Sequence, residues 1–314
     1  MMHAYWADAA EKNEIIEFID YVFSKAHCPH DFATLLPKLY GEQGDGAAHH
    51  FVVREDGKIA ATVLVYPVTM HIGERTLMTL GVGSVSTRPG ARGKGYMRLI
   101  MDAVDARAKE TGAAFAVLGG QRQRYQYFGY DCAGYQLHGQ FTPDNARHAL
   151  RTVDAQAYDV TPMTQAHVPQ AAALMRRQAC FCARSEEAYL DLLRSWNNEP
   201  FALLREGRPV GFGALRRNEG NCHMAELLLE DEADFPAVMK LLSARYGTLT
   251  LCAAPWQRQR ARWMSSVCEE YAVQPNHQFK FYDEEKVRAV CAALDGFLPM
   301  EMALPVCVMP ADCV

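Results

Sequence analysis

The chain has 314 residues, of which 49% are hydrophobic and 22% charged, and its formal net charge is −5. This length suggests two domains, and the composition is typical of a globular protein with a substantial core. The excess of acidic residues argues against a nucleic-acid-binding surface, and no apolar run approaches the ~18 residues of a membrane span.

The first part of the chain predicts one strand, two helices and two hairpins. In chain order we expect a strand at 5–7, helices at 11–23 and 29–40, and strands at 50–54, 58–67, 68–72 and 75–87. Asp56-Gly57 and Gly73-Glu74 supply the hairpin turns. Gly81 and Gly83 indicate a β-bulge in the last of these strands.

An amphipathic helix follows a loop rich in glycine and arginine. Its start is predicted near Gly95 and its end at Thr111-Gly112, where glycine suits the position after a helix. Its apolar positions recur at helical spacing, at Met97, Ile100, Met101, Val104 and Ala108. A short buried strand is expected at 113–118. Strand, loop, helix and strand then form a βαβ unit, whose ligand should lie at the C-terminal ends of the strands.

The loop between strand and helix predicts a phosphate site, in particular for a pyrophosphate. Backbone N–H groups and the helix dipole favour an anion there, and Arg92 and Lys94 add two cations. It is not a Walker P-loop, because Gly95 follows Gly93-Lys94 where Ser or Thr is required. On these residues alone, an ordinary strand–loop–helix turn with solvated basic side chains is the alternative.

Two motifs resemble those of the Gcn5-related N-acetyltransferase (GNAT) superfamily. Residues 92–97, Arg-Gly-Lys-Gly-Tyr-Met, resemble motif A, Gln/Arg-x-x-Gly-x-Gly/Ala, except that Met97 replaces a small residue. Residues 121–130, Gln-Arg-Gln-Arg-Tyr-Gln-Tyr-Phe-Gly-Tyr, resemble motif B, Tyr-x-x-x-Gly-Phe/Tyr. The resemblance implies that acetyl-CoA is the co-substrate and that it is bound by Val85, Ser86, Thr87, Arg92, Gly93, Lys94, Gly95 and Tyr96.

Tyr125 falls on the tyrosine that, in this superfamily, protonates the departing coenzyme A thiolate. A phenol with a pKa of about 10 is protonated at neutral pH, whereas a thiol titrates near 8.5. The alternative is that Tyr125 belongs to an aromatic cluster with a packing role. That packing role is what we expect for Tyr127, Phe128 and Tyr130.

The second half of the chain resembles a degenerate second copy of the same fold. After a polar stretch at 143–157 we expect helices at 166–177 and 185–195, strands at 201–204, 209–216 and 224–229, a helix at 233–246, a strand at 249–253 and a helix at 256–271. Glu230-Asp231-Glu232 stands where motif A would lie. Because these charges would repel a pyrophosphate, we expect no coenzyme A in this copy.

We therefore predict an α/β fold with a mixed sheet, built from two tandem GNAT domains at 1–145 and 146–276. A C-terminal extension at 277–314 should contain a strand at 279–282, a helix at 284–294 and an apolar segment at 304–308. The tandem resembles the bacterial enhanced-intracellular-survival (Eis) acetyltransferases. Those proteins add a sterol-carrier-like domain, which we expect to be truncated or absent here, so their aminoglycoside specificity is not carried over.

The resemblance implies an N-acetyltransferase in which a primary amine of a small molecule or peptide attacks the acetyl-CoA thioester directly. An alkyl amine has a pKa near 10 and must first lose a proton. Residues 77–87, where relatives carry a glutamate base, contain neither Asp nor Glu. The base is then a water chain, a residue from elsewhere, or the terminal carboxylate of Val314, since the chain terminus lies in the catalytic site of the Eis relatives. This carboxylate could instead anchor the amine, and a frayed tail without a role in the site is the alternative. Two alternatives are a coenzyme A-binding regulatory protein without turnover, and an acyl or aminoacyl transferase acting on peptide or cell-wall substrates.

Cysteine usage and the N-terminal sequence predict a cytoplasmic protein. The ten cysteines include no Cys-x-x-Cys pair, and the N-terminus shows no signal peptide pattern. His49-His50 has no carboxylate or cysteine close by in sequence, so no metal site is predicted. We expect neither nucleic acid nor membrane as a partner, and the sequence leaves open whether the chain forms a homo-oligomer.

Overall fold

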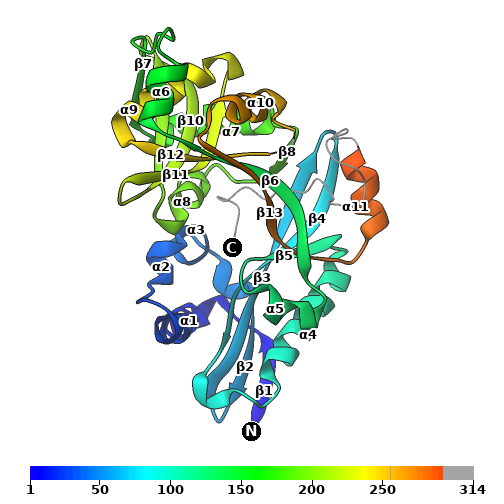
Figure 1. The fold of residues 1–314 in the computed structure, drawn as a ribbon. Helices are drawn as coiled ribbons and strands as arrows, with labels where there is room; N and C mark the ends of the chain where they lie inside the picture. Colours follow the sequence, from blue (N-terminus) through cyan, green and yellow to red (C-terminus); the bar gives the residue numbers. More distant parts are fainter. Residues whose placement is uncertain (255, 293–314) are drawn as a thin grey trace. The chain divides into compact units, whose positions relative to one another are not determined.

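The structure is a computed structural model that describes residues 1–254 and 256–292 of the chain (Figure 1). These residues fall into two compact units. Unit 1 comprises residues 1–132 together with 277–290, and unit 2 comprises the remainder of the described chain. Both are mixed α/β, as the sequence predicted.

Unit 1 contains a six-stranded sheet in the order β1-β2-β3-β4-β5-β13. The β4–β5 pair is parallel, whereas its other neighbouring strands are antiparallel. Its elements are β1 (Met2–Trp6), α1 (Lys12–Ala26), α2 (Phe32–Leu35), α3 (Pro37–Tyr40), β2 (His50–Glu55), β3 (Lys58–Ile72), β4 (Arg75–Thr87), α4 (Tyr96–Thr111), β5 (Phe115–Leu118), α5 (Arg122–Tyr125), the last residues of β13 (Glu270–Phe281), and α11 (Glu284–Cys291).

Two prolines explain where the elements of unit 1 depart from prediction. The helix expected at 29–40 is divided into α2 and α3, because Pro37 disfavours a helical residue before it and itself starts α3. The strands expected at 58–67 and 68–72 form the single strand β3. Pro67 is tolerated within it because it lies beyond the last pair with β2, His50–Leu64, so β2 loses no hydrogen bond.

Helix α4 packs its predicted apolar stripe on one face of this sheet. Ile100 and Val104 are fully buried and contact a cluster that includes Val63 and Val82 of the sheet, while Met97 is half-buried beside it. Helix α1 lies on the opposite face (Figure 1). The sheet is therefore covered on both sides, which explains the long apolar runs of β3 and β4.

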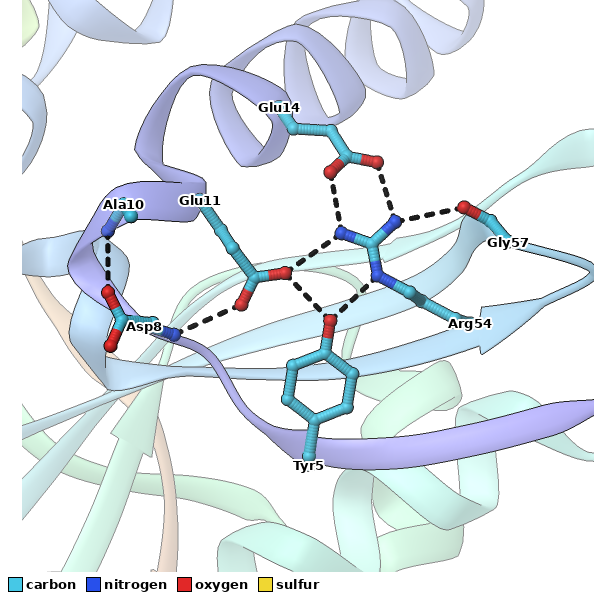
Figure 2. Close-up of polar contacts among 7 residues, drawn as sticks. All are labelled: Tyr5, Asp8, Ala10, Glu11, Glu14, Arg54 and Gly57. Atoms are coloured by element: carbon cyan, nitrogen blue, oxygen red, sulfur yellow. Dashed lines mark hydrogen bonds and ion pairs between the residues drawn. The ribbon is translucent and has the colours of Figure 1, made fainter.

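An ion-pair network fixes the start of α1 against β1 and β2 (Figure 2). Arg54 of β2 donates to both Glu14 oxygens at 2.7 and 2.5 Å, to Glu11 at 2.8 Å and to the Tyr5 hydroxyl at 2.7 Å. Glu11 also accepts from the backbone N–H of Asp8, which closes a capping box. The guanidinium is 17% exposed, so this network is better shielded from solvent than a surface pair.

Unit 2 contains a sheet in the order β6-β12-β11-β10-β9-β7, in which β11 and β12 are parallel. Its elements are β6 (Asp131–Phe141), whose first two residues belong to unit 1, α6 (Pro143–Ala149), β7 (Tyr158–Pro162), α7 (Val168–Arg176), β8 (Cys180–Cys182), α8 (Tyr189–Arg194), β9 (Glu199–Arg205), β10 (Arg208–Asn218), β11 (Asn221–Leu229), α9 (Phe235–Tyr246), β12 (Thr248–Ala253) and α10 (Arg258–Val267).

Two segments of unit 2 differ from the sequence-based expectation. The polar stretch at 143–157 begins with α6, which Thr142 caps and Pro143 starts, a signal that was present in the sequence. The last predicted helix is shorter than expected, because α10 ends at Val267 and β13 starts at Glu270.

Each sheet ends in a strand from the other half of the sequence. Strand β6 follows α5 in the chain but pairs with β12, from Leu137–Ala253 to Phe141–Leu249. Residues 278–281 of β13 pair with β5 in turn. The segment predicted as an extension therefore contributes a strand and α11 to unit 1. The sequence boundaries at 145 and 276 stay predictions, since they concern consecutive copies rather than compact units.

Candidate active site

The pairing of β4 with β5 ends before the C-terminal end of β4. They pair only from Thr79–Phe115 to Val82–Leu118, whereas β4 continues to Thr87. On its other side β4 keeps pairing with β3 up to Ala61–Thr87. Backbone groups of β4 beyond Val82 on the side of β5 thus have no β5 partner, and we call this stretch, residues 83–87, the splayed edge of β4.

A β-bulge lies at this splayed edge. Leu64 pairs with Gly83 and Thr62 with Ser86, so β4 has one residue more than β3 between the two pairs. The predicted bulge is therefore present, although at Ser84 rather than at Gly81 or Gly83. Ser84 has a φ of 50°, which is strained for a residue that is not glycine.

The loop before α4 presents consecutive backbone donors. Gly93 and Gly95 have φ values of 80° and 82°, a conformation that glycine adopts without strain. Within the described chain, the N–H groups of residues 93–97 donate to no backbone or side-chain acceptor. Five such donors at the N-terminus of a 16-residue helix are an arrangement that favours an anion.

The three cationic side chains of the loop differ in their partners. Arg88 donates to the carbonyl of Ile59 at 2.9 and 2.8 Å and has a structural role. Lys94 donates to both oxygens of Glu55, at 2.7 and 2.8 Å. Arg92 is exposed, and no carboxylate in the described part of the chain pairs with it.

The other predicted cofactor contacts lie on the adjoining stretch of β4. Val85 packs against the cluster under α4, and Thr87 ends the strand. Ser86 is 2% exposed, and its hydroxyl has no hydrogen-bond partner among the described residues. Tyr96 is buried at the first position of α4. The predicted cofactor contacts therefore lie on the end of β4, on the loop that follows it and on the first residue of α4.

Tyr125 lies on α5, directly after β5. Its side chain is 6% exposed, and its ring packs so closely on Gly120 that a Cβ there would lie 2.9 Å from the ring. Burial raises the pKa of the phenol, and the neighbouring Arg124 only partly offsets this. Tyr125 is therefore protonated at neutral pH, the state that an acid requires. Phe128 and Tyr130 pack as expected, whereas Tyr127 is 84% exposed and the prediction that it packs was wrong.

A comparison with known families agrees with this geometry. Residues 6–133 match the family described as the acetyltransferase (GNAT) domain. They form a GNAT domain. No curated protein matches the chain.

Solved structures extend the likeness in fold to the second half of the chain. A probable N-acyltransferase from Enterococcus faecalis V583 is 14% identical, with a TM-score of 0.69 over 90% of this chain and 73% of that one. A GCN5-related N-acetyltransferase from Kribbella flavida is 16% identical, with a TM-score of 0.66 over 96% and 76%. Eis1 from Mycobacterium abscessus is 14% identical, with a TM-score of 0.62 over 92% and 76%. At these identities the comparison shows a shared fold.

Sequence reasoning missed a buried polar chain in the GNAT domain. Tyr40 of α3, His50 of β2, Thr62 of β3 and Ser84 of β4 are joined by contacts of 2.8 to 2.9 Å. The available signal was the alternation along β2, which places His50 on the same face as Val52. In the sequence, His49-His50 was considered only as a metal ligand. Among the described residues, no group of His, Cys, Asp and Glu side chains could hold a metal ion.

In unit 2 the acidic run at 230–232 is engaged in internal contacts. Glu230 pairs with Arg208 at 2.7 Å, and Glu232 pairs at 2.6 Å with Arg260, which is 4% exposed. Asp231 caps the turn before α9 by accepting from the N–H of Ala233. The N–H of Ala233 in this loop is thus already satisfied by a carboxylate, in contrast to the N–H groups of residues 93–97.

Val314, predicted to contribute its terminal carboxylate, lies outside the described residues. Among the helices of residues 1–254 and 256–292, none is long and apolar enough to cross a membrane.

Proposed function

We propose that the GNAT domain is an acetyl-CoA-dependent N-acetyltransferase that acts on a primary amine of a small molecule or peptide. The observation that carries this proposal is the row of N–H donors at residues 93–97. Among the described residues these donors have no acceptor, and the neighbouring Arg92 has no carboxylate partner. Fold alone does not define a reaction, so the proposal rests on this site.

The donor set fits the pyrophosphate of coenzyme A. Five N–H groups and a helix N-terminus favour two adjacent phosphates, and a Cβ at Gly93 or Gly95 would meet no atom within 4 Å, so the loop is open to a ligand. Residues 85–87 would hold the pantetheine arm through the backbone groups that β5 leaves unpaired. Acetyl-CoA, when bound, supplies the activated thioester.

Residues of the chain would then perform two tasks. A backbone N–H of β4 at the splayed edge can donate to the thioester carbonyl oxygen, which stabilises negative charge there. Tyr125 holds a proton on its phenol oxygen for the departing thiolate. Its burial supports this role, because a raised pKa keeps the proton in place until a strong base forms beside it.

We further propose that residues 146–276 are a degenerate copy of the GNAT domain that binds no coenzyme A. The order of elements supports this, since, apart from the short elements α3 and β8, the series β7, α7, α8, β9, β10, β11, α9 and β12 repeats the order of the first half. The ion pairs of Glu230 and Glu232 support it as well, because they place carboxylates where an anion would bind.

Calorimetry with acetyl-CoA tests both proposals. We expect one site per chain. Arg92→Glu should lower the affinity for acetyl-CoA roughly ten- to a hundredfold, because hydrogen bonds between charged groups are stronger than those between neutral groups. Arg151→Glu, a charge reversal at an exposed residue of unit 2, is the matched control. Two equivalent sites would contradict the degenerate copy, and unchanged affinity in Arg92→Glu would contradict the loop as the anion site.

A thiol-release screen over n-propylamine, spermidine, lysine, a peptide with a free N-terminus and an aminoglycoside tests the reaction. Release of coenzyme A that depends on the amine is expected. Binding without release with any amine would instead support a coenzyme A-binding regulatory protein. Turnover only with a longer acyl chain or an aminoacyl donor would support an acyl or aminoacyl transferase.

A further inference from the structure

The buried polar chain in the GNAT domain ends at the splayed edge of β4. Thr62 and His50 lie in its interior, Tyr40 links them to β4, and Ser84 is its last member. Ser84 is half-buried, and its backbone forms the bulge just beyond the last β4–β5 pair. The chain thus connects a fully buried histidine with a hydroxyl next to the proposed reaction site.

The direction of every hydrogen bond in this chain follows from its buried end. The carbonyl oxygen of Phe51 can only accept, so Thr62 donates its single hydroxyl hydrogen to it at 2.9 Å. Thr62 Oγ1 must then accept from His50 Nδ1 at 2.8 Å. A neutral imidazole protonated at Nδ1 accepts at Nε2, here from the Tyr40 hydroxyl at 2.8 Å. Tyr40 has no second hydrogen, so its oxygen accepts from Ser84 at 2.9 Å.

This direction holds only while His50 is neutral, because an imidazolium donates from both nitrogens. His50 is 0% exposed, and burial lowers the pKa of its imidazole from 6.5 to about 3, with a smaller contribution from the nearby His49. Burial likewise raises the pKa of Tyr40 above its usual value, so the phenol keeps its proton. The chain therefore has one fixed direction at neutral pH.

The consequence is that the Ser84 oxygen can only accept toward a ligand. Its single hydrogen is engaged with Tyr40, while its two lone pairs accept from no other donor among the described residues. Val85, the next residue, packs into the cluster on the α4 face. Ser84 in contrast contacts α3, so its hydroxyl lies on the face of the sheet away from α4.

We propose that Ser84 Oγ accepts a hydrogen bond from an N–H of the acceptor amine and so orients the amine for attack, with Tyr40 and His50 as positioning residues. The inference rests on the proposed function. An amine bound through its N–H keeps its nitrogen lone pair free to attack a thioester carbon. A serine that donated would engage this lone pair and block the attack, so the fixed direction of the chain matters for the reaction.

Nuclear magnetic resonance tests the direction of the chain without any substrate. In the full chain labelled with [15N]histidine, long-range 1H–15N correlations distinguish the tautomers of each imidazole. We expect His50 to carry its hydrogen on Nδ1 and to keep this state from a pH of about 8 down to about 5. Tyr40→Phe should shift the His50 Nε2 signal. Protonation at Nε2, or an imidazolium, would reverse the chain and overturn the proposal.

Kinetics test the role of Ser84 with the amine that the wild type acetylates fastest in the screen above. Ser84→Gly removes the hydroxyl and suits the φ of 50°, so the fold should be kept. We expect about a tenfold fall in kcat/KM for the amine with an unchanged Kd for acetyl-CoA. Tyr40→Phe, which frees the Ser84 hydrogen to donate, should act in the same direction.

Thr79→Val is the matched control, since it removes a β4 hydroxyl that is engaged with Val68 in the paired part of the strand. It should leave kcat/KM for the amine at the wild-type value. Unchanged kinetics in Ser84→Gly would overturn the role of Ser84 while leaving the proposed function intact. A wild type that binds acetyl-CoA but acetylates no amine would overturn the proposed function and this inference together.

Discussion

Lys94 of the anion loop donates two hydrogen bonds to Glu55, which ends β2. This contact holds the pKa of Lys94 above and that of Glu55 below its usual value. A carboxylate therefore lies against the loop proposed to receive a pyrophosphate. It neutralises Lys94 and leaves Arg92 as the cation that meets the ligand first.

Glu55→Gln is expected to tighten acetyl-CoA binding. The change removes a negative charge next to the phosphate site and releases Lys94 for the ligand. Because both groups are exposed and screened by solvent, the gain should be only about two- to fivefold in Kd and should shrink at high salt. Calorimetry at two ionic strengths measures it, with the exposed Glu17→Gln as the control. Weaker binding would mean that Glu55 holds the loop in its binding conformation.

Tyr125→Phe is expected to lower kcat by roughly 10²–10⁴-fold, the usual effect of losing an acid or base, with little change in the Kd of acetyl-CoA. The wild-type phenol should stay protonated well above neutral pH, because burial raises its pKa. Steady-state kinetics and calorimetry measure the two quantities. Tyr127→Phe is the control, since this phenol lies two residues away and is 84% exposed. A near-wild-type kcat in Tyr125→Phe would assign Tyr125 to packing.

Local patterns predicted much of the GNAT domain. The stripe of α4 and the glycine at its end depend on residues a few positions apart, and motif A lies within one loop, so the sequence contains what is needed. The predicted end of a strand at Pro67 was wrong, because whether a proline interrupts β3 depends on whether β2 reaches that position, which is a long-range property.

Several features that the sequence did not predict depend on contacts between distant segments. The hydrogen bond from Ser84 to Tyr40 spans 44 residues, and the bulge shifted to Ser84 because register is set by pairing with β3. The exchange of β6 and β13 between the two sheets has no local signature either, since each strand has the alternation that either sheet would accept.

Glu226→Gln in unit 2 is expected to lower the free energy of unfolding by roughly 3–5 kcal/mol, because it removes the carboxylate charge that pairs with the buried Arg184. The two side chains are only 3% and 2% exposed, and they form hydrogen bonds of 2.9 and 2.6 Å. Chemical denaturation monitored at the unit 2 transition measures the loss. Glu199→Gln, which breaks an exposed pair with Arg217, is the control and should change little. Equal losses of unfolding free energy in both variants would show that burial of the ion pair does not determine the loss.

His50 is expected to make stability depend on pH in the acidic range. Its pKa is about 3 in the folded state and 6.5 in the unfolded chain, so between these values the unfolded chain binds one more proton. The contribution of His50 is thus fully present above pH 6.5 and is lost as the pH falls toward 3. At a pH of about 5 the loss should be about 2 kcal/mol.

His50→Gln, which keeps an acceptor for Tyr40 but cannot be protonated, should remove this part of the dependence. Denaturation of both proteins at pH values of about 5 and 7 measures the difference, and His148→Gln on the surface of α6 controls for the loss of an imidazole. Other buried histidines contribute equally to both proteins and cancel in the comparison, so an identical slope for wild type and His50→Gln would contradict a neutral His50.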